Sequence, residues 1–169
     1  MKDQTLYFKD NFFSKGRTEI YNNTKGKVGE LDLKSAFSSS VDVLDKNGHL
    51  VMTGKFRFFS NKWRISDSSD IEVGVLKQKL SFLSKKFEYD SNGRGILSIQ
   101  AVAFSRQYDI FDEQSNLIAR FERVSGFFSS PAFKLTNYHE KFPIEELIAV
   151  VMGINAIQQR NNSAAAGGG

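Results

Sequence analysis

The sequence predicts a mainly β protein, built as a closed antiparallel β-barrel around one hydrophobic α-helix near the C-terminus. Three observations support this prediction. Apolar and polar residues alternate with a period of two over most of the chain, turn-forming residues interrupt the alternation at short intervals, and one long apolar segment spans residues 147–157. With 169 residues, 40% of them apolar, the chain can bury a sizeable core as one domain.

The alternating segments are typical of strands that have one face in the core and one in water. In residues 55–58 two Phe alternate with a Lys and an Arg, so we expect Phe56 and Phe58 to share the inward face. Residues 62–65 repeat this pattern with an inward Trp and Ile. Clusters of Asp, Asn, Ser and Gly indicate tight turns at residues 45–48, 66–70, 90–93 and 113–116.

The last part of the chain is predicted to be a helix that the rest of the protein encloses. Pro143 stands near its first turn, and Glu145 and Glu146 face the positive end of the helix dipole. The residues that follow are apolar on nearly every side, and such a helix must be enclosed by protein or lipid. A bilayer span needs about 20 apolar residues, more than this segment has. We therefore expect a buried central helix that contains Leu147, Ile148, Val150, Val151, Ile154 and Ile157.

Internal repeats indicate that one hairpin geometry is used several times. Residues 33–51 align with residues 100–118 without a gap, and their apolar, acidic and turn positions coincide. Residues 56–65 align in the same way with residues 80–89. Further copies of the Phe-Phe-Ser stretch at 58–60 stand at residues 12–14 and 127–129. Because a reused hairpin twists the same way each time, the sheet can curl and close, with Phe side chains packed on the enclosed helix.

Composition bounds the domain organisation and the possible chemistry. We expect a single barrel domain over residues 1–162 and a flexible Ala/Gly tail over residues 163–169. No apolar signal segment follows the N-terminus, so we expect a cytoplasmic protein, with peripheral attachment to a membrane left open. The chain has no Cys and 2 His, which excludes disulfides, thiolate nucleophiles and Cys-ligated zinc. We expect neither a metal nor a cofactor.

Basic residues concentrate in the middle of the chain. Pairs of cations two positions apart lie on one strand face, and on neighbouring strands such pairs form a stripe on the barrel exterior. Near an anionic leaflet each Lys or Arg contributes about 1 kcal/mol of attraction. A solvated outer face explains the same pattern, since the net charge is only +4. The candidate phospholipid-binding residues are Lys55, Arg57, Lys62, Arg64, Lys77, Lys79, Lys85 and Lys86.

Other conspicuous motifs favour structure over chemistry. Asp42 and Asp45, like Asp109 and Asp112 in the repeat, are three positions apart, which sends the two carboxylates of a strand to opposite faces. The second Asp of each pair begins a turn, where Asp accepts hydrogen bonds from the backbone. Residues 93–95 lack the third glycine of a nucleotide-binding loop.

Nucleic acid and catalysis are both disfavoured. Trp63 and Tyr89 alternate with cations and should lie in the core, so they offer no stacking surface for bases. We interpret His49, next to a turn, and His139, in the stretch of residues 137–140, as surface residues and not as catalysts. A barrel filled by a helix leaves no deep pocket for a substrate, and we expect no catalytic residues and no enzyme.

The chain resembles the tubby C-terminal-like domains, in the bacterial group related to plant LURP-one proteins and more distantly to phospholipid scramblases. The resemblance covers about residues 5–160 and rests on the hairpin at residues 45–51, the unit at residues 80–87 and the terminal apolar helix. It implies an antiparallel barrel of roughly twelve strands around a central C-terminal helix. Tubby proteins bind phosphoinositides and scramblases act on bilayers, but no phosphoinositide-binding residue of tubby matches a position in this chain.

The basic stripe and the resemblance together predict a non-enzymatic binding module that recognises anionic phospholipid or phosphoinositide headgroups at a membrane surface. The alternative is a protein-interaction or stress-related scaffold of the same family with no lipid role. The expected partners are accordingly anionic membrane lipid or another protein.

Overall fold

The structure is a computed structural model that describes residues 4–34, 40–80, 85–101 and 106–167. Within these residues it contains twelve strands, one short 3-10 helix and one α-helix. The strands are β1 (Thr5–Lys9), β2 (Gly16–Tyr21), β3 (Lys27–Leu33), β4 (Ser40–Asp45), β5 (Leu50–Phe56), β6 (Trp63–Asp67), β7 (Glu72–Lys79), β8 (Lys86–Asp90), β9 (Ile96–Ala101), β10 (Tyr108–Phe111), β11 (Leu117–Val124) and β12 (Ala132–Asn137). The helices are η1 (Asp10–Phe13) and α1 (Ile144–Ala166).

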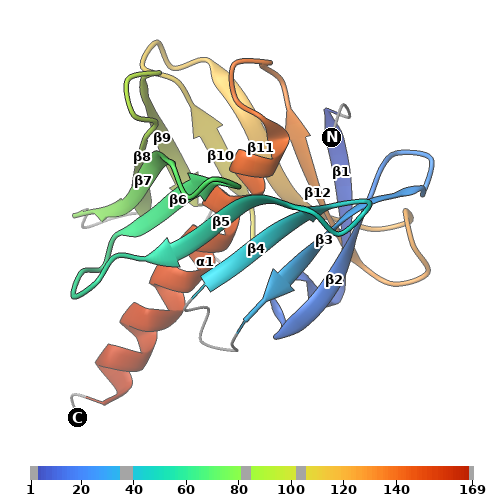
Figure 1. Cartoon of the computed structure of the whole chain (residues 1–169), viewed down its shortest axis with the longest axis horizontal. Helices are drawn as coiled ribbons and strands as arrows, with labels where there is room; N and C mark the ends of the chain where they lie inside the picture. The colour runs from blue at the N-terminus through green and yellow to red at the C-terminus, as the bar shows by residue number, and fades with distance from the viewer. Residues whose placement is uncertain (1–3, 35–39, 81–84, 102–105, 168–169) are drawn as a thin grey trace.

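The sheet is a closed antiparallel barrel in which each strand pairs with its neighbours in sequence (Figure 1). The barrel closes where β1 pairs with β12, with Leu6 opposite Leu135. Closure gives every strand a hydrogen-bonded neighbour on both sides, so no sheet edge is left open to another chain. The predicted fold class is confirmed.

The period of two in the sequence becomes an inward and an outward face of each strand. In β6, Trp63 and Ile65 are buried, and Arg64 between them lies on the outside. Tyr89 in β8 is also in the core, as expected. One expectation is wrong: β5 ends at Phe56, and Phe58 lies beyond it in the turn with 87% of its surface exposed. The alternating pattern in the sequence extends to residue 58, two positions beyond the end of β5, so it predicted an inward side chain where there is no strand.

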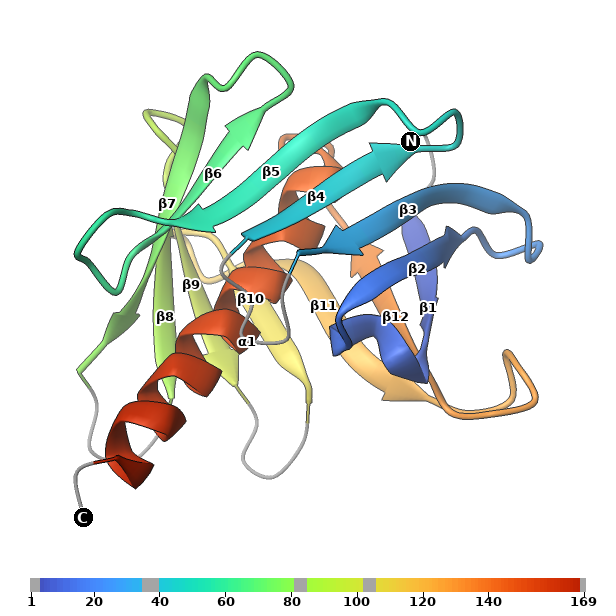
Figure 2. The ribbon, with the colours of Figure 1, turned by 60° about the horizontal axis from the view of Figure 1, so that its bottom comes forward.

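Helix α1 runs through the inside of the barrel (Figure 2) and packs most extensively on β4 to β7. Every residue from Ile144 to Ile157 is buried, which confirms the enclosed helix. The six apolar positions expected on it are all fully buried: Leu147, Ile148, Val150, Val151, Ile154 and Ile157. The helix is longer than expected, because residues 163–166 of the predicted tail belong to it, although they are exposed.

The repeated segments pair in the same way. In the hairpin of β4 and β5, Asp42 lies opposite Thr53, and the register shifts between Val43 and Leu44. In the hairpin of β10 and β11, the aligned Asp109 lies opposite Arg120, and the register shifts at the equivalent place. Residues 35–39, 81–84 and 102–105 of the aligned segments lie outside the described residues.

Trp63 joins the barrel wall to the helix. Its indole Nε1 donates a hydrogen bond of 3.2 Å to the carbonyl oxygen of Ala149 in α1. The ring lies between two glycines: a Cβ added to Gly54 would stand 2.5 Å from Nε1, and one added to Gly153 would stand 2.4 Å from Cδ1. The indole therefore occupies the volume that larger residues would need at both positions, which explains glycine within a strand and within a helix.

Replacing Gly153 by Ala is expected to destabilise the protein, although Ala is the better helix former. Ala gains about 1 kcal/mol over Gly in a helix. Overpacking a core costs about 1–3 kcal/mol or more, so we expect a net loss of about 1–2 kcal/mol, measured by urea unfolding. In a Trp63→Phe background the same substitution should cost less, because the smaller ring leaves room. A Gly153→Ala variant more stable than the wild type would contradict this account.

Candidate anion-binding surface

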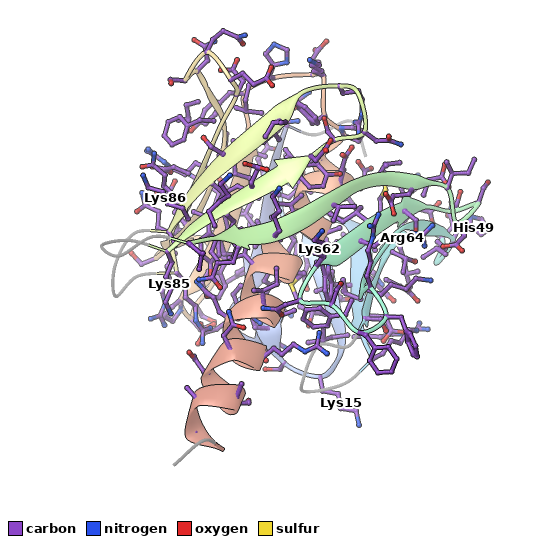
Figure 3. The ribbon with its side chains drawn as sticks, turned by 90° about the vertical axis from the view of Figure 1, so that its left-hand side faces the viewer. Lys15, His49, Lys62, Arg64, Lys85 and Lys86 are labelled. Carbon is purple, nitrogen blue, oxygen red and sulfur yellow. The ribbon has the colours of Figure 1, made fainter. Side chains whose placement is uncertain are left out.

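The eight candidate cations lie on, or directly beside, four strands that are neighbours in the barrel. Lys55 is in β5 and Arg57 follows its last residue, while Lys62 stands just before β6, which contains Arg64. Of the other four, Lys77 and Lys79 are in β7, Lys85 stands just before β8, and Lys86 begins β8. Because β5 to β8 are consecutive in the sheet, the cations gather on one side of the barrel, part of which Figure 3 shows.

Carboxylates neutralise the cations of β5 and β6. The Arg57 guanidinium donates to both oxygens of Glu72, at 2.7 and 2.8 Å. Arg64 contacts Glu72 at 3.2 Å and Asp70 at 2.6 Å, and its hydrogen bond lowers the pKa of the Asp70 carboxyl. Lys55 also lies 3.6 Å from Asp70. These three cations and two carboxylates form a network of ion pairs on the surface of the barrel.

A second carboxylate site neutralises the cations of β7. The Nζ atoms of Lys77 and Lys79 each lie 2.8 Å from an oxygen of Glu88, which stands opposite Lys77 on β8. Hydrogen bonds from the two ammonium groups lower the pKa of the Glu88 carboxyl. Five of the eight candidates are therefore paired with a carboxylate.

Three of the candidates have no carboxylate partner within the part of the chain that the structure describes: Lys62, Lys85 and Lys86. All three are exposed. Lys62 stands in the connection between β5 and β6, Lys85 stands in the connection between β7 and β8, and Lys86 begins β8. In an antiparallel barrel these two connections lie at the same end. In the alignment of residues 56–65 with 80–89, Lys62 and Lys86 occupy equivalent positions.

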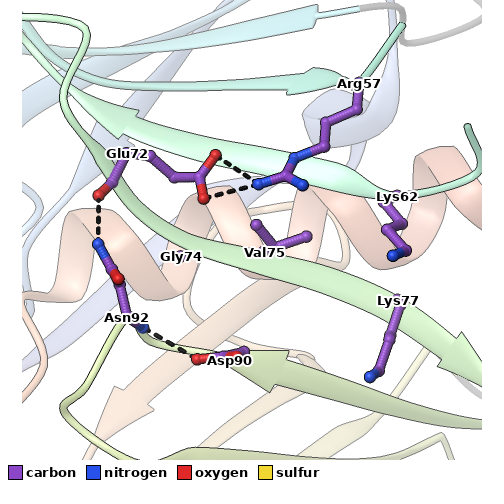
Figure 4. Close-up of a pocket in the computed structure, with 8 residues that line it drawn as sticks. All are labelled: Arg57, Lys62, Glu72, Gly74, Val75, Lys77, Asp90 and Asn92. Carbon is purple, nitrogen blue, oxygen red and sulfur yellow. Dashed lines mark hydrogen bonds and ion pairs between the residues drawn. The ribbon is translucent and has the colours of Figure 1, made fainter.

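A shallow pocket of about 210 Å³ lies beside Lys62, between β6, β7 and β8 (Figure 4). Lys62 and Lys77 line one side of the pocket, and Glu72 and Asn92 line the other. On that second side, the Asn92 side chain donates a hydrogen bond of 3.1 Å to the carbonyl oxygen of Glu72. Arg57 also lines the pocket, but the Glu72 carboxylate holds its guanidinium. Of the two ammonium groups that line the pocket, that of Lys77 is paired with Glu88, and only that of Lys62 has no carboxylate partner among the described residues.

The second Asp of each repeated pair, Asp45 or Asp112, accepts hydrogen bonds in a turn, as expected. The Asp45 carboxylate accepts hydrogen bonds from the backbone N–H groups of Asn47 and His49 at 2.8 and 2.9 Å. Asp112 in the aligned turn accepts from Gln114 and Asn116 at 3.0 and 2.8 Å. The backbone hydrogen bond from His49 is the main cause that lowers the pKa of Asp45. These carboxylates are held as backbone acceptors.

Sequence reasoning missed a buried ion pair at the start of α1. The Glu146 carboxylate is 1% exposed and receives two hydrogen bonds from Arg94, at 2.6 and 2.8 Å, and one from the Tyr89 hydroxyl at 2.5 Å. Arg94 also donates to the carbonyl oxygens of Val73 and Ser91. Burial and the Glu146 charge raise the pKa of Tyr89, so its hydroxyl stays a donor. A carboxylate before an enclosed apolar run needs a cationic partner, but nothing in the sequence pointed to Arg94.

Of the helices that the structure describes, none combines the length and the apolar character needed to cross a membrane. In the same residues, no three His, Asp or Glu side chains gather in a way that could hold a metal ion.

Comparisons with known proteins identify the family of the chain and a protein of similar fold. A search of curated proteins found no match. The chain is similar in fold to an Arabidopsis thaliana protein of known X-ray structure, with a TM-score of 0.59 and 12% sequence identity over 89% of this chain and 90% of that one. Residues 4–153 match the model of the LURP-one-related family. Since this match covers most of the described barrel, the chain belongs to the LURP-one-related family.

Proposed function

We propose that the protein is a non-enzymatic binding module that recognises anionic phospholipid headgroups, phosphoinositides included, at a membrane surface. Membership of the LURP-one-related family supports a binding or scaffold role. The observation that carries the lipid proposal is the set of Lys62, Lys85 and Lys86, exposed at one end of the barrel without carboxylate partners among the described residues. The other five candidates have their charge satisfied within the protein and are not needed as ligands.

The register of β7 and β8 adds to this argument. Lys86 lies directly opposite Lys79 in the strand pair. Like charges in this position repel each other, and Glu88 contacts Lys79 and Lys77 but is not in ion-pair contact with Lys86. A bound phosphate group would relieve the repulsion. At about 1 kcal/mol for each cation near an anionic leaflet, three lysines contribute about 3 kcal/mol, which suits weak and reversible attachment.

Charge reversal of the three lysines is expected to abolish binding to anionic vesicles. The assay is co-sedimentation at low salt with vesicles of equal parts phosphatidylcholine and phosphatidylserine, compared with phosphatidylcholine alone. We expect the wild type to sediment only with the anionic vesicles, and the Lys62→Glu, Lys85→Glu, Lys86→Glu variant to stay in solution. Added salt should weaken wild-type binding, because it screens exposed charges.

A matched control variant distinguishes binding at a specific site from attraction by the net positive charge of the protein. Lys25, Lys46 and Lys141 are exposed in connections at the opposite end of the barrel, after β2, β4 and β12. Their reversal to Glu changes the net charge by the same amount and should leave binding intact. No binding by the wild type would end the lipid proposal and favour a protein-interaction scaffold. Equal loss in both triple variants would show attraction by net charge alone.

A further inference from the structure

The connection between β5 and β6 presents two aromatic rings to solvent. Residues 57–60 form a tight turn, closed by a hydrogen bond of 3.2 Å from the Ser60 N–H to the Arg57 carbonyl oxygen. Phe58 and Phe59 occupy its two central positions and are 87% and 93% exposed. Their ring centroids are 4.1 Å apart, so the two rings contact each other. Together they form one apolar projection, the aromatic tip.

The backbone at the aromatic tip is poorly suited to an aromatic residue. Phe59 has φ of +51°, in the left-handed region that Gly and Asn adopt more readily. Phe59 is 93% exposed and its ring contacts that of Phe58, so within the described part of the chain this bulky side chain adds little to the packing of the fold. Strained backbone conformations of this kind cluster at functional sites, where their role in binding or catalysis offsets the cost in stability.

The other Phe-Phe-Ser stretches show that exposure is not a property of the motif. Phe12 and Phe13 are buried in the core. Phe127 stacks on Tyr7 with 3.6 Å between ring centroids, and Phe128 contacts Tyr21 edge to face. Both of these copies follow odd-numbered strands, as the aromatic tip does. The protein packs two copies of the stretch and leaves the third in water.

Helix α1 holds the turn in place. Arg160 donates a hydrogen bond of 2.9 Å from Nη1 to the Ser60 carbonyl oxygen, and its guanidinium stands 4.2 Å from the centroid of the Phe56 ring. Asn61 donates to the side chain of Asn161 at 2.8 Å. The end of the central helix thus fixes the base of the turn, and the two rings project from a supported position.

The surroundings of the aromatic tip fit a bilayer better than a protein pocket. Leu80, directly after β7, is a further fully exposed apolar residue at the same end of the barrel. Lys62 stands just after the tip, and Lys85 and Lys86 follow the β7 end. Apolar projections beside unpaired cations match an anionic headgroup layer above an apolar interior. We propose that Phe58 and Phe59 insert into the interfacial region of an anionic bilayer while Lys62 contacts its headgroups, an inference that rests on the proposed function.

The absence of cysteine from the chain allows a direct test. A Phe58→Cys variant is labelled with an environment-sensitive fluorophore and titrated with the phosphatidylserine vesicles described above. We expect a blue shift and a rise in emission, because the label leaves water. A His49→Cys variant, labelled in the connection between β4 and β5 at the opposite end of the barrel, is the control and should show neither change.

A second variant tests the rings themselves. Phe58→Ser with Phe59→Ser removes apolar surface that is exposed in the folded protein, so folding should be retained. Its binding to the anionic vesicles should weaken by at least about tenfold, since the apolar contribution of two Phe is lost. The binding that remains should be more sensitive to salt than that of the wild type.

The outcomes distinguish this inference from the function on which it rests. Sedimentation with vesicles but no change at the Phe58 label would overturn insertion and leave headgroup binding standing. No sedimentation of the wild type would overturn both. A response of the label to a soluble protein partner, with none to vesicles, would identify a protein-docking tip and overturn the bilayer proposal.

Discussion

A Val151→Asp variant is expected to lose its native fold. Val151 lies in the middle of α1, is fully buried, and is enclosed by the barrel on all sides. A carboxylate there has no cationic partner, and an unpaired charge in the core costs several kcal/mol. Since a domain of this kind is stable by only about 5–15 kcal/mol, one such substitution removes most or all of the stability. Ile148→Asp should behave in the same way.

Circular dichroism and thermal unfolding measure this effect. The expected result is a spectrum without native strand signal and no cooperative transition. Asn162→Asp places a carboxylate on an exposed position of the same helix and should unfold like the wild type. If the Val151→Asp variant kept the native spectrum and a cooperative transition, α1 would not be enclosed in solution.

Removal of Arg94 should produce the second largest effect. An Arg94→Met variant leaves the buried Glu146 carboxylate with the Tyr89 hydroxyl as its remaining partner among the three donors described above. Breaking a buried ion pair on one side costs about 3–5 kcal/mol, because a charge stays buried without compensation. Urea unfolding should show a loss of this size, with the midpoint moved to lower urea.

The double variant separates the ion pair from the packing of Arg94. With Glu146→Met added to Arg94→Met, no charge is left buried, and most of the lost stability should return. Tyr89 then loses its acceptor, so we expect recovery to remain incomplete by about 1 kcal/mol. An Arg94→Met variant within 1 kcal/mol of the wild type would show that the pair does not hold the start of α1 to the barrel.

Those features of the fold that depend on local periodicity could be predicted from the sequence. Trp63 and Ile65 are inward and Arg64 is outward because successive side chains of a strand point to opposite faces. The apolar run in α1 had to be enclosed because no face of it tolerates water. Both predictions use only near neighbours in the chain, which is why they are confirmed.

The candidate site depended on partners that are far apart in sequence. Glu72 lies 15 positions from Arg57, yet their side chains form two hydrogen bonds across the face of the barrel. Glu88 meets Lys77 and Lys79 because the register of β7 and β8 sets Glu88 opposite Lys77, and Lys79 lies two positions further along the same face of β7. The sequence showed a run of cations, but the pairing that leaves only some of them without a carboxylate came from strand register.

By itself, the sequence determined the strand-and-turn order, the inward residues within the strands and the enclosed helix. These features follow from the two-residue pleat and from the cost of exposing apolar surface. The tertiary structure alone decided that Arg94 meets Glu146, that carboxylates neutralise five cations, and that Phe58 and Phe59 stay in water while similar pairs are packed. These contacts join residues that closure of the barrel brings together, and no local pattern carries the register that aligns them.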